Sequence, residues 1–180
     1  MLINPIFQDN AILQAKAPFR IFGHAYGKVT VAVGSEVLST NANGDWLLTF
    51  SPRQYADVTD ITVQCENEEI TIRNVTFGDV YLLCGQSNMY YSLGGATEDG
   101  EIYECDSIRL YSTDPTEKST RFKSADGWVP CNADTASKFP ALGYFIAREL
   151  QQFINKPVGL VIAAQGASYI QSWLPQSVLD

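Results

Sequence analysis

Two uninterrupted apolar runs, residues 80–84 (VYLLC) and 158–164 (VGLVIAA), constrain the fold of this chain more than any other feature. Runs without polar alternation are typical of parallel strands that are covered on both faces. A segment with helical spacing, residues 141–154, lies between them; its apolar face comprises Leu142, Phe145, Ile146, Leu150 and Phe153. Because strand, helix and strand form the unit of parallel sheets, we predict an α/β region here.

The first 77 residues show a different pattern, in which short β-type segments alternate with turn signals. A first segment ends near Tyr26-Gly27, residues 28–33 alternate cleanly, and Asn43-Gly44-Asp45 is typical of a tight turn. About six short strands at this spacing predict an antiparallel, immunoglobulin-like β-sandwich over residues 1–77. We place a domain boundary before Gly78 and assign residues 78–180 to the α/β region.

Between the two apolar runs, residues 94–137 are polar and irregular. Turn signals occur at Gly94-Gly95, Asp114-Pro115 and Asp126-Gly127. We expect one short strand inside this segment, near residues 107–111.

Charge and length argue against several classes of partner. The 180 residues include 12 Lys and Arg and 20 Asp and Glu, a net charge of −8 with no basic cluster. This balance argues against nucleic acid and against anionic membrane surfaces as partners. No apolar run approaches the roughly 18 residues of a transmembrane helix, and the first residues lack a signal-peptide pattern. We therefore expect a cytoplasmic protein of one or two small domains.

The cysteines and histidine do not form a metal motif. Cys65, Cys84, Cys105 and Cys131 are too far apart for a Cys-x-x-Cys site, and His24 is the only histidine. We assign neither a metal nor a cofactor, and we expect free thiols that pack as small hydrophobic groups. A disulfide remains an alternative, because pairing depends on distances that the sequence does not give.

The segments that follow the two apolar runs carry the chemistry. Ser87 lies in CGQSNM (84–89), directly after the first run and at the expected start of a helix through Leu93. Gly166 follows the second run, so both residues are predicted at the carboxyl edge of the sheet, where α/β proteins place their sites. Backbone N–H groups there favour a developing negative charge. From the residues alone, Ser87 as a helix N-cap and Gly166 as an ordinary loop glycine remain alternatives.

Three segments resemble the sialate O-acetylesterases, a branch of the SGNH/GDSL-type hydrolases. Residues 78–89 (GDVYLLCGQSNM) resemble the family's signature around its nucleophile, and residues 139–150 (FPALGYFIAREL) resemble its following helix. Residues 157–173 (PVGLVIAAQGASYIQSW) look like its next strand and loop, and the N-terminal strands are similar to its leading β-sandwich. The resemblance implies a β-sandwich followed by an incomplete, flavodoxin-like α/β domain.

The resemblance also implies roles for individual residues. Ser87 would be the nucleophile that attacks an acetyl ester, and the backbone N–H groups of Ser87 and Gly166 would form the oxyanion hole. Gln86 and Gln165 are assigned to substrate binding, Asp79 to the junction of the two regions, and Trp173 to packing. Two departures from the family pattern stand out: Ala167 replaces a glycine, which matters if this position needs a positive φ, and Gln165 stands where tryptophan is common.

A serine nucleophile needs a base, and the family's histidine and aspartate lie far toward the C-terminus, outside these residues. We expect His24 to be an ordinary residue of the sandwich. The sequence therefore predicts the N-terminal portion of an esterase for acetylated sugars such as sialic acid, inactive alone and with exposed apolar sheet edges. Three alternatives stay open: a non-catalytic glycan-binding module, a non-catalytic truncated descendant, and a subunit completed by a C-terminal partner chain.

Overall fold

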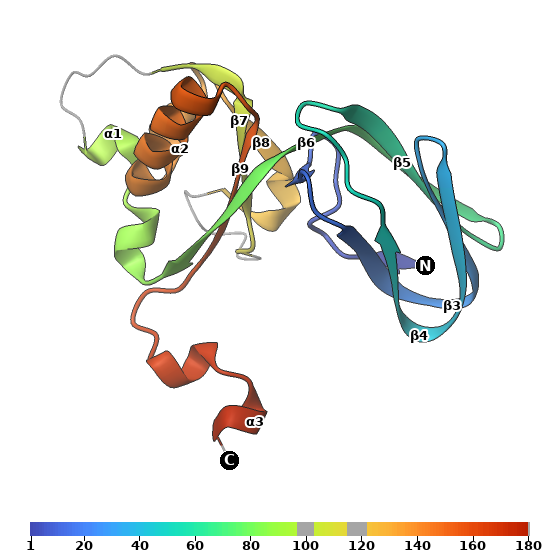
Figure 1. The fold of residues 1–180 in the computed structure, drawn as a ribbon. Helices are drawn as coiled ribbons and strands as arrows, with labels where there is room; N and C mark the ends of the chain where they lie inside the picture. The colour runs from blue at the N-terminus through green and yellow to red at the C-terminus, as the bar shows by residue number, and fades with distance from the viewer. Residues whose placement is uncertain (97–102, 115–121, 180) are drawn as a thin grey trace.

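The computed structural model describes residues 1–96, 103–114 and 122–179. Within them, nine strands form one hydrogen-bonded sheet in the order β1-β3-β5-β6-β9-β7-β8, with β2 beside β6 and β4 beside β3. The N-terminal strands and the helix-bearing C-terminal region lie at opposite ends of the molecule, joined by the long strand β6 (Figure 1). The chain is thus a mixed sheet with few helices. Pro115 of the expected Asp114-Pro115 turn lies outside the described residues.

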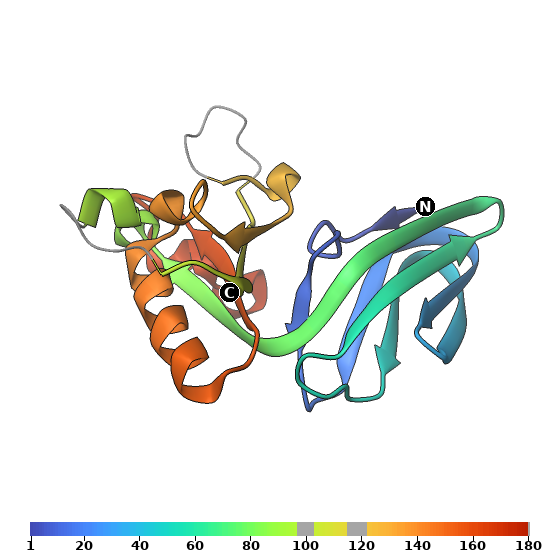
Figure 2. The same ribbon diagram turned by 90° about the horizontal axis from the view of Figure 1, so that it is seen from above.

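The N-terminal region is built on a long hairpin of β3 (Phe19–Val33) and β4 (Glu36–Phe50). The short strands β1 (Leu2–Ile3) and β2 (Ile12–Gln14) and the longer β5 (Val58–Cys65) complete it. These strands curve around one apolar core, which includes Ile21, Val31, Phe50, Val63 and Phe77 (Figure 2). They hydrogen-bond as a continuous sheet, so the two-layer sandwich stays a prediction.

The expected breaks within this hairpin are wrong. Tyr26 pairs directly with Asn43 in the middle of an unbroken ladder, so neither Tyr26-Gly27 nor Asn43-Gly44-Asp45 ends a strand. Gly27 and Gly44 do adopt positive φ, at 110° and 116°. Glycine can adopt this unusual backbone conformation inside a paired strand. The strand pairing and the alternating burial continue on both sides of each glycine.

Strand β6 (Glu68–Gly85) crosses the predicted domain boundary without interruption. Its first half pairs with β5, and its second half, from Asp79, pairs in parallel with β9 (Val158–Ala164). Gly78 lies at the transition, where a Cβ would stand 2.2 Å from the carbonyl oxygen of Pro157. Only glycine permits that backbone approach. The division of the chain into two domains stays a prediction.

The C-terminal region confirms the strand–helix–strand prediction. Strands β6, β9 and β7 (Cys105–Ser112) are parallel, and β8 (Trp128–Cys131) is antiparallel to β7.

Helix α2 spans Ala141–Ile154, as predicted, and β7 contains the expected strand at residues 107–111. Gly127, with φ 69°, provides the expected turn after Asp126. Gly94-Gly95 instead lies in a short helix. The short helices are η1 (Ser87–Tyr90), α1 (Leu93–Ala96), η2 (Ser124–Asp126), η3 (Ala136–Lys138), η4 (Ile170–Trp173) and α3 (Gln176–Leu179).

Helix α2 presents a different face to the sheet from the one predicted, although Phe145 and Leu150 of the predicted face are partly buried against the core. Its buried residues are Ala141, Gly143, Tyr144, Ala147 and Gln151, whereas Leu142, Ile146 and Phe153 are 50%, 43% and 89% exposed. A Cβ at Gly143 would stand 2.4 Å from a methyl carbon of Leu83. The small residues on this face allow the helix to approach the sheet closely, and Leu142, Ile146 and Phe153 remain on the exposed side.

Burial also differs between the two apolar runs. Val158, Leu160 and Ile162 of β9 are at most 1% exposed, as predicted for a strand covered on both faces. On β6, Leu83 is buried but Tyr81 and Leu82 are 37% and 64% exposed, and Cys84 is exposed. Among the described strands, none pairs with the outer edge of residues 79–85, so this half of β6 is an open edge.

Candidate active site

The two predicted loops do meet at one edge of the sheet. Gly85, the last residue of β6, is in register with Ala164, the last residue of β9. The backbone N–H of Gln165 donates to the carbonyl oxygen of Gly85 at 2.9 Å, which carries the ladder one step past the strands. Parallel pairing therefore places the segments beginning at Gln86 and Gln165 side by side.

Ser87 is exposed at this edge, as the first residue of η1. The predicted helix from Ser87 through Leu93 is wrong, because η1 is a four-residue 3₁₀ turn and α1 starts anew at Leu93. Gln86 occupies the N-cap position, so Ser87 is not a helix cap either. Within the described part of the chain, no hydrogen bond engages the Ser87 hydroxyl. So short a turn provides no significant helix dipole, and stabilisation of an anion here must come from individual N–H groups.

Gly166 lies close to Ser87. A Cβ built on Gly166 would stand 3.7 Å from the Cβ of Ser87, an ordinary van der Waals separation. The side-chain amide of Gln86 donates from Nε2 to the carbonyl oxygen of Ser168 at 2.6 Å and so connects the two loops. The structure thus brings Ser87, Gln86 and Gly166 together. Their roles as nucleophile, substrate ligand and oxyanion donor stay predictions, as does substrate binding by Gln165.

The loop after β9 has two features that fix its shape. Ala167 has a φ of 58°, so a residue with a Cβ occupies the left-handed conformation that glycine adopts most easily. Ser168 donates from Oγ to the carbonyl oxygen of Gln165 at 2.7 Å and accepts the indole N–H of Trp173 at 2.9 Å. Trp173 thus anchors the loop. Sequence reasoning did not assign a role to Ser168. The only indication in the sequence was that a small polar residue follows Gly166 and Ala167.

Asp79 has the structural contacts expected of a residue at the junction. Its Oδ1 accepts hydrogen bonds from Tyr55 Oη at 2.9 Å and from Gln14 Nε2 at 3.2 Å. The bond to Asp79 raises the pKa of the Tyr55 hydroxyl above its ordinary value. Asp79 therefore connects β2 and the loop after β4 to β6, and it is not part of the Ser87 edge.

His24 does not contribute a base to the site. This residue lies on β3, and its Nδ1 is 2.8 Å from Oδ1 of Asp45 on β4. The β3–β4 hairpin and the turn that follows β6 are at opposite ends of the molecule (Figure 1). The structure therefore agrees with the expectation that His24 belongs to the N-terminal sheet and does not serve Ser87.

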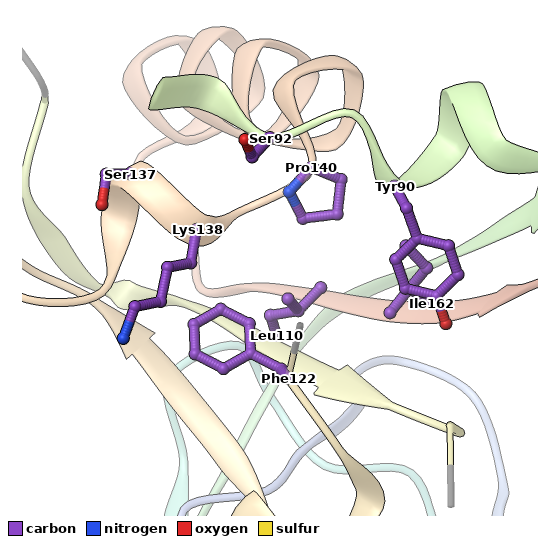
Figure 3. Close-up of a pocket in the computed structure, with 8 residues that line it drawn as sticks. All are labelled: Tyr90, Ser92, Leu110, Phe122, Ser137, Lys138, Pro140 and Ile162. Atoms are coloured by element: carbon purple, nitrogen blue, oxygen red, sulfur yellow. The ribbon is translucent and has the colours of Figure 1, made fainter. Parts of the chain in front are cut away.

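A pocket of about 360 Å³ lies near the carboxyl ends of β7 and β9. Leu110, Phe122 and Ile162 form its apolar wall, and the side chains of Tyr90 and Lys138 also line it (Figure 3). Ser87 is not among the residues that line it, although Tyr90 belongs to the same short turn, η1. The exposed Ser87 edge and this pocket are therefore neighbouring but separate features.

The four cysteines are free, which settles the alternative of a disulfide in favour of thiols. Burial raises the pKa of the Cys131 thiol to about 11. Over the described ranges, no group of three or more His, Cys, Asp or Glu side chains could hold a metal ion. In the same residues, no helix is both long and apolar enough to cross a membrane.

Comparison with known proteins gives consistent matches. Residues 77–179 match the family model for carbohydrate esterases described as sialic acid-specific acetylesterases. The sialate O-acetylesterase of Rattus norvegicus is 25% identical over 200 residues, covering 95% of this chain and 37% of the relative. The human sialate O-acetylesterase is 24% identical over 168 residues, covering 81% of this chain and 32% of the relative.

A solved structure shares the fold. The crystal structure of a carbohydrate acetylesterase from Xanthomonas citri superimposes with a TM-score of 0.78 at 24% sequence identity. The match covers 98% of this chain and 43% of that protein. The chain thus spans about a third of the length of the curated relatives that it matches, and less than half of the solved structure.

Proposed function

This chain belongs to the sialic acid-specific acetylesterase family of carbohydrate esterases, and on that basis we propose that it contributes the nucleophile of an esterase that removes acetyl groups from sugars. The observation that carries the proposal is the proximity of the exposed Ser87 to Gly166, at the ends of two neighbouring parallel strands. Serine hydrolysis needs a reachable hydroxyl and nearby backbone donors; Ser87 is exposed, and we assign the donors to the backbone N–H groups of Ser87 and Gly166.

In the proposed reaction, Ser87 Oγ attacks the acetyl carbonyl carbon and loses its proton to a general base. The backbone N–H groups of Ser87 and Gly166 stabilise the resulting oxyanion. The carbonyl re-forms as the C–O bond to the sugar breaks, and the departing sugar oxygen takes a proton. Water then hydrolyses the acetyl-enzyme to acetate and restores Ser87. The substrate class, acetylated sialic acid or another acetylated sugar, follows from the family.

We propose that the general base comes from a further region, because His24, the one histidine of these 180 residues, lies on β3. Two uncovered apolar surfaces support an additional region: the open edge of β6 with Tyr81 and Leu82, and the outer face of α2 with Leu142 and Phe153. Apolar surface of this kind is normally covered by further protein. We propose that this region, in a longer polypeptide or a partner chain, covers both surfaces and brings a histidine to Ser87. A protein made only of these residues should have negligible turnover.

The decisive test measures acetyl-ester hydrolysis by the protein together with the region that completes it. Ser87→Ala should reduce kcat on an acetylated sialic acid by at least about a thousandfold, because the covalent step is lost. Ser35→Ala, in the exposed turn between β3 and β4, is the matched control and should leave kcat unchanged. Activity that survives Ser87→Ala would refute the nucleophile. Full activity of the 180 residues alone would refute the missing base.

A further inference from the structure

Cys105 and Cys131 are directly opposed across two neighbouring strands. Cys105 is the first residue of β7, Cys131 is the last residue of β8, and the two are antiparallel register partners. Strands β7 and β8 lie side by side in the C-terminal region (Figure 1). Cys65 on β5 and Cys84 on β6 have no cysteine among their register partners in the described strands. The fold thus brings together two cysteines that are separated in the sequence.

The separation of such partners suits a disulfide bond. Directly opposite residues of antiparallel strands have Cα atoms about 4.5 or 5.5 Å apart, depending on their hydrogen bonding, and their side chains share one face of the sheet. A disulfide needs a Cα–Cα separation of about 4.4–6.8 Å. Both separations fall in this range, so the bond can form without a shift of either strand.

In the reduced protein, each thiol is turned toward a polar neighbour. Cys105 Sγ is 2.9 Å from Ser107 Oγ, and the Cys131 thiol donates to the carbonyl oxygen of Tyr103 at 3.7 Å. Thiols form only weak hydrogen bonds, so these contacts are easily replaced. Rotation about χ1 of the two cysteines exchanges them for a bond between the two sulfur atoms.

The backbone around both cysteines is anchored. The backbone N–H of Tyr103 donates to Tyr144 Oη on α2 at 2.6 Å, and Tyr103 Oη donates to Gln151 Oε1 on the same helix at 2.7 Å. After β8, the backbone N–H of Asn132 donates to Thr135 Oγ1 at 3.0 Å. These hydrogen bonds hold the two cysteine-bearing segments in place before any covalent bond forms.

The ladder beside this pair is irregular. The register of β7 with β8 shifts between Cys105 and Arg109, and consecutive pairing begins only at Arg109 with Pro130. Cys105 and Cys131 therefore form an isolated pair at the end of the ladder. A covalent bond would hold the start of β7 against β8 where the regular pairing is interrupted.

We propose that Cys105 and Cys131 form a reversible disulfide bond that fixes the start of β7 to the end of β8. The oxidant is a low-molecular-weight disulfide such as glutathione disulfide. Cys105 reacts first, because it is partly exposed whereas Cys131 is buried.

The bond forms by two thiol–disulfide exchanges. The Cys105 thiolate attacks glutathione disulfide, which gives a mixed disulfide and releases one glutathione. The Cys131 thiolate then attacks the Cys105 sulfur, forms the new S–S bond and releases the second glutathione. The two protein thiols lose two electrons and two protons, and glutathione disulfide gains them as it becomes two thiols.

Peptide mapping by mass spectrometry tests this proposal in a Cys84→Ser variant. Trypsin leaves Cys84 and Cys105 in one peptide, residues 74–109, so the variant makes Cys105 the only cysteine of that peptide. The folded protein is treated with glutathione disulfide at about pH 8.5, because burial raises the pKa of the Cys131 thiol to about 11 and thiolates are the reactive species. Peptides 74–109 and 124–138 should become joined with loss of two hydrogen atoms. The free thiols should fall from three to one, and dithiothreitol should restore them.

Thermal unfolding supplies a second readout. The bond closes the loop of residues 105–131, so oxidation should raise the melting temperature by about 5–10 °C. Cys105→Ser in the same background is the matched control and should gain neither the crosslink nor the stability. Circular dichroism should show that this control is folded, and the peptide map does not depend on it.

Four outcomes would overturn the proposal. They are retention of all three free thiols, a glutathione adduct that persists on Cys105 without the crosslink, a crosslink to Cys65, and a crosslink that leaves the melting temperature unchanged. None of these readouts depends on esterase activity, so failure of this proposal and failure of the proposed function are distinguishable.

Discussion

Strands β6 and β9 contain similar apolar runs but lie in different environments. They are paired in register from Asp79 with Val158 to Gly85 with Ala164. Strand β9 lies between β6 and β7 and is buried on both faces, whereas the half of β6 that pairs with β9 has no second neighbour among the described strands and exposes Leu82. An apolar run shows that a strand can be buried, and its neighbours determine whether it is. Ser87 and Gly166 follow these two strands at the edge where both strands end.

The largest expected difference between the two strands is in stability. Leu160→Ala on β9 should lower the free energy of unfolding by about 2–5 kcal/mol, because it leaves a cavity under a fully buried side chain. Leu82→Ala on β6 should change it by less than about 0.5 kcal/mol, because that side chain is 64% exposed. Urea unfolding of both variants measures the contrast, and equal losses would mean that β6 is covered.

Thiol accessibility sharpens the same comparison. Cys84 on β6 is exposed, whereas Cys131 on β8 is buried and its thiol has a pKa raised to about 11. A maleimide should therefore label Cys84 about a hundredfold faster than Cys131 at neutral pH, since thiolates are the reactive species. Mass spectrometry of peptides follows each site over time. The region that completes the protein should protect Cys84, and unchanged labelling of Cys84 in its presence would contradict coverage of β6.

The smallest expected effect concerns the loop that follows β9. Ala167→Gly should raise the free energy of unfolding by about 0.5 kcal/mol, because relief of the positive φ slightly exceeds the entropy that glycine loses on folding. Thermal unfolding measures this gain. Ala163→Gly, in β9 itself, is the control and should destabilise the protein, since its strand conformation gains nothing from glycine. A loss of stability in Ala167→Gly would mean that the left-handed conformation is not strained.

Several parts of the fold and site were accessible from the sequence because they depend on local pattern. The limits of α2, the parallel pairing of β6 with β9 and the shared edge of Ser87 and Gly166 all follow from periodicity and from the end of an apolar run. The family resemblance, confirmed by the match over residues 77–179, rests on short motifs at the same edge. These features do not test the predictions of a cytoplasmic location and of two separate domains.

The errors arose where packing overrides local preference. Asn43-Gly44-Asp45 has the composition of a turn, yet cross-strand pairing holds it inside β4. Helix α2 has a stripe of large apolar side chains, yet it packs through Gly143 and Ala147 because these let it approach Leu83. Helical spacing identifies an apolar face, but the shape of the partner surface selects the face that is buried.

The sequence by itself determined that two apolar strands and a helix form a parallel unit, and that a serine and a glycine follow the strands. These features depend on the local order of apolar and polar residues along the chain. Only the tertiary structure decided that Ser87 lies close to Gly166, that Ala167 is left-handed and that none of the described strands pairs with the outer edge of residues 79–85. Such facts depend on which segments meet in space, and contacts between residues distant in sequence fix them.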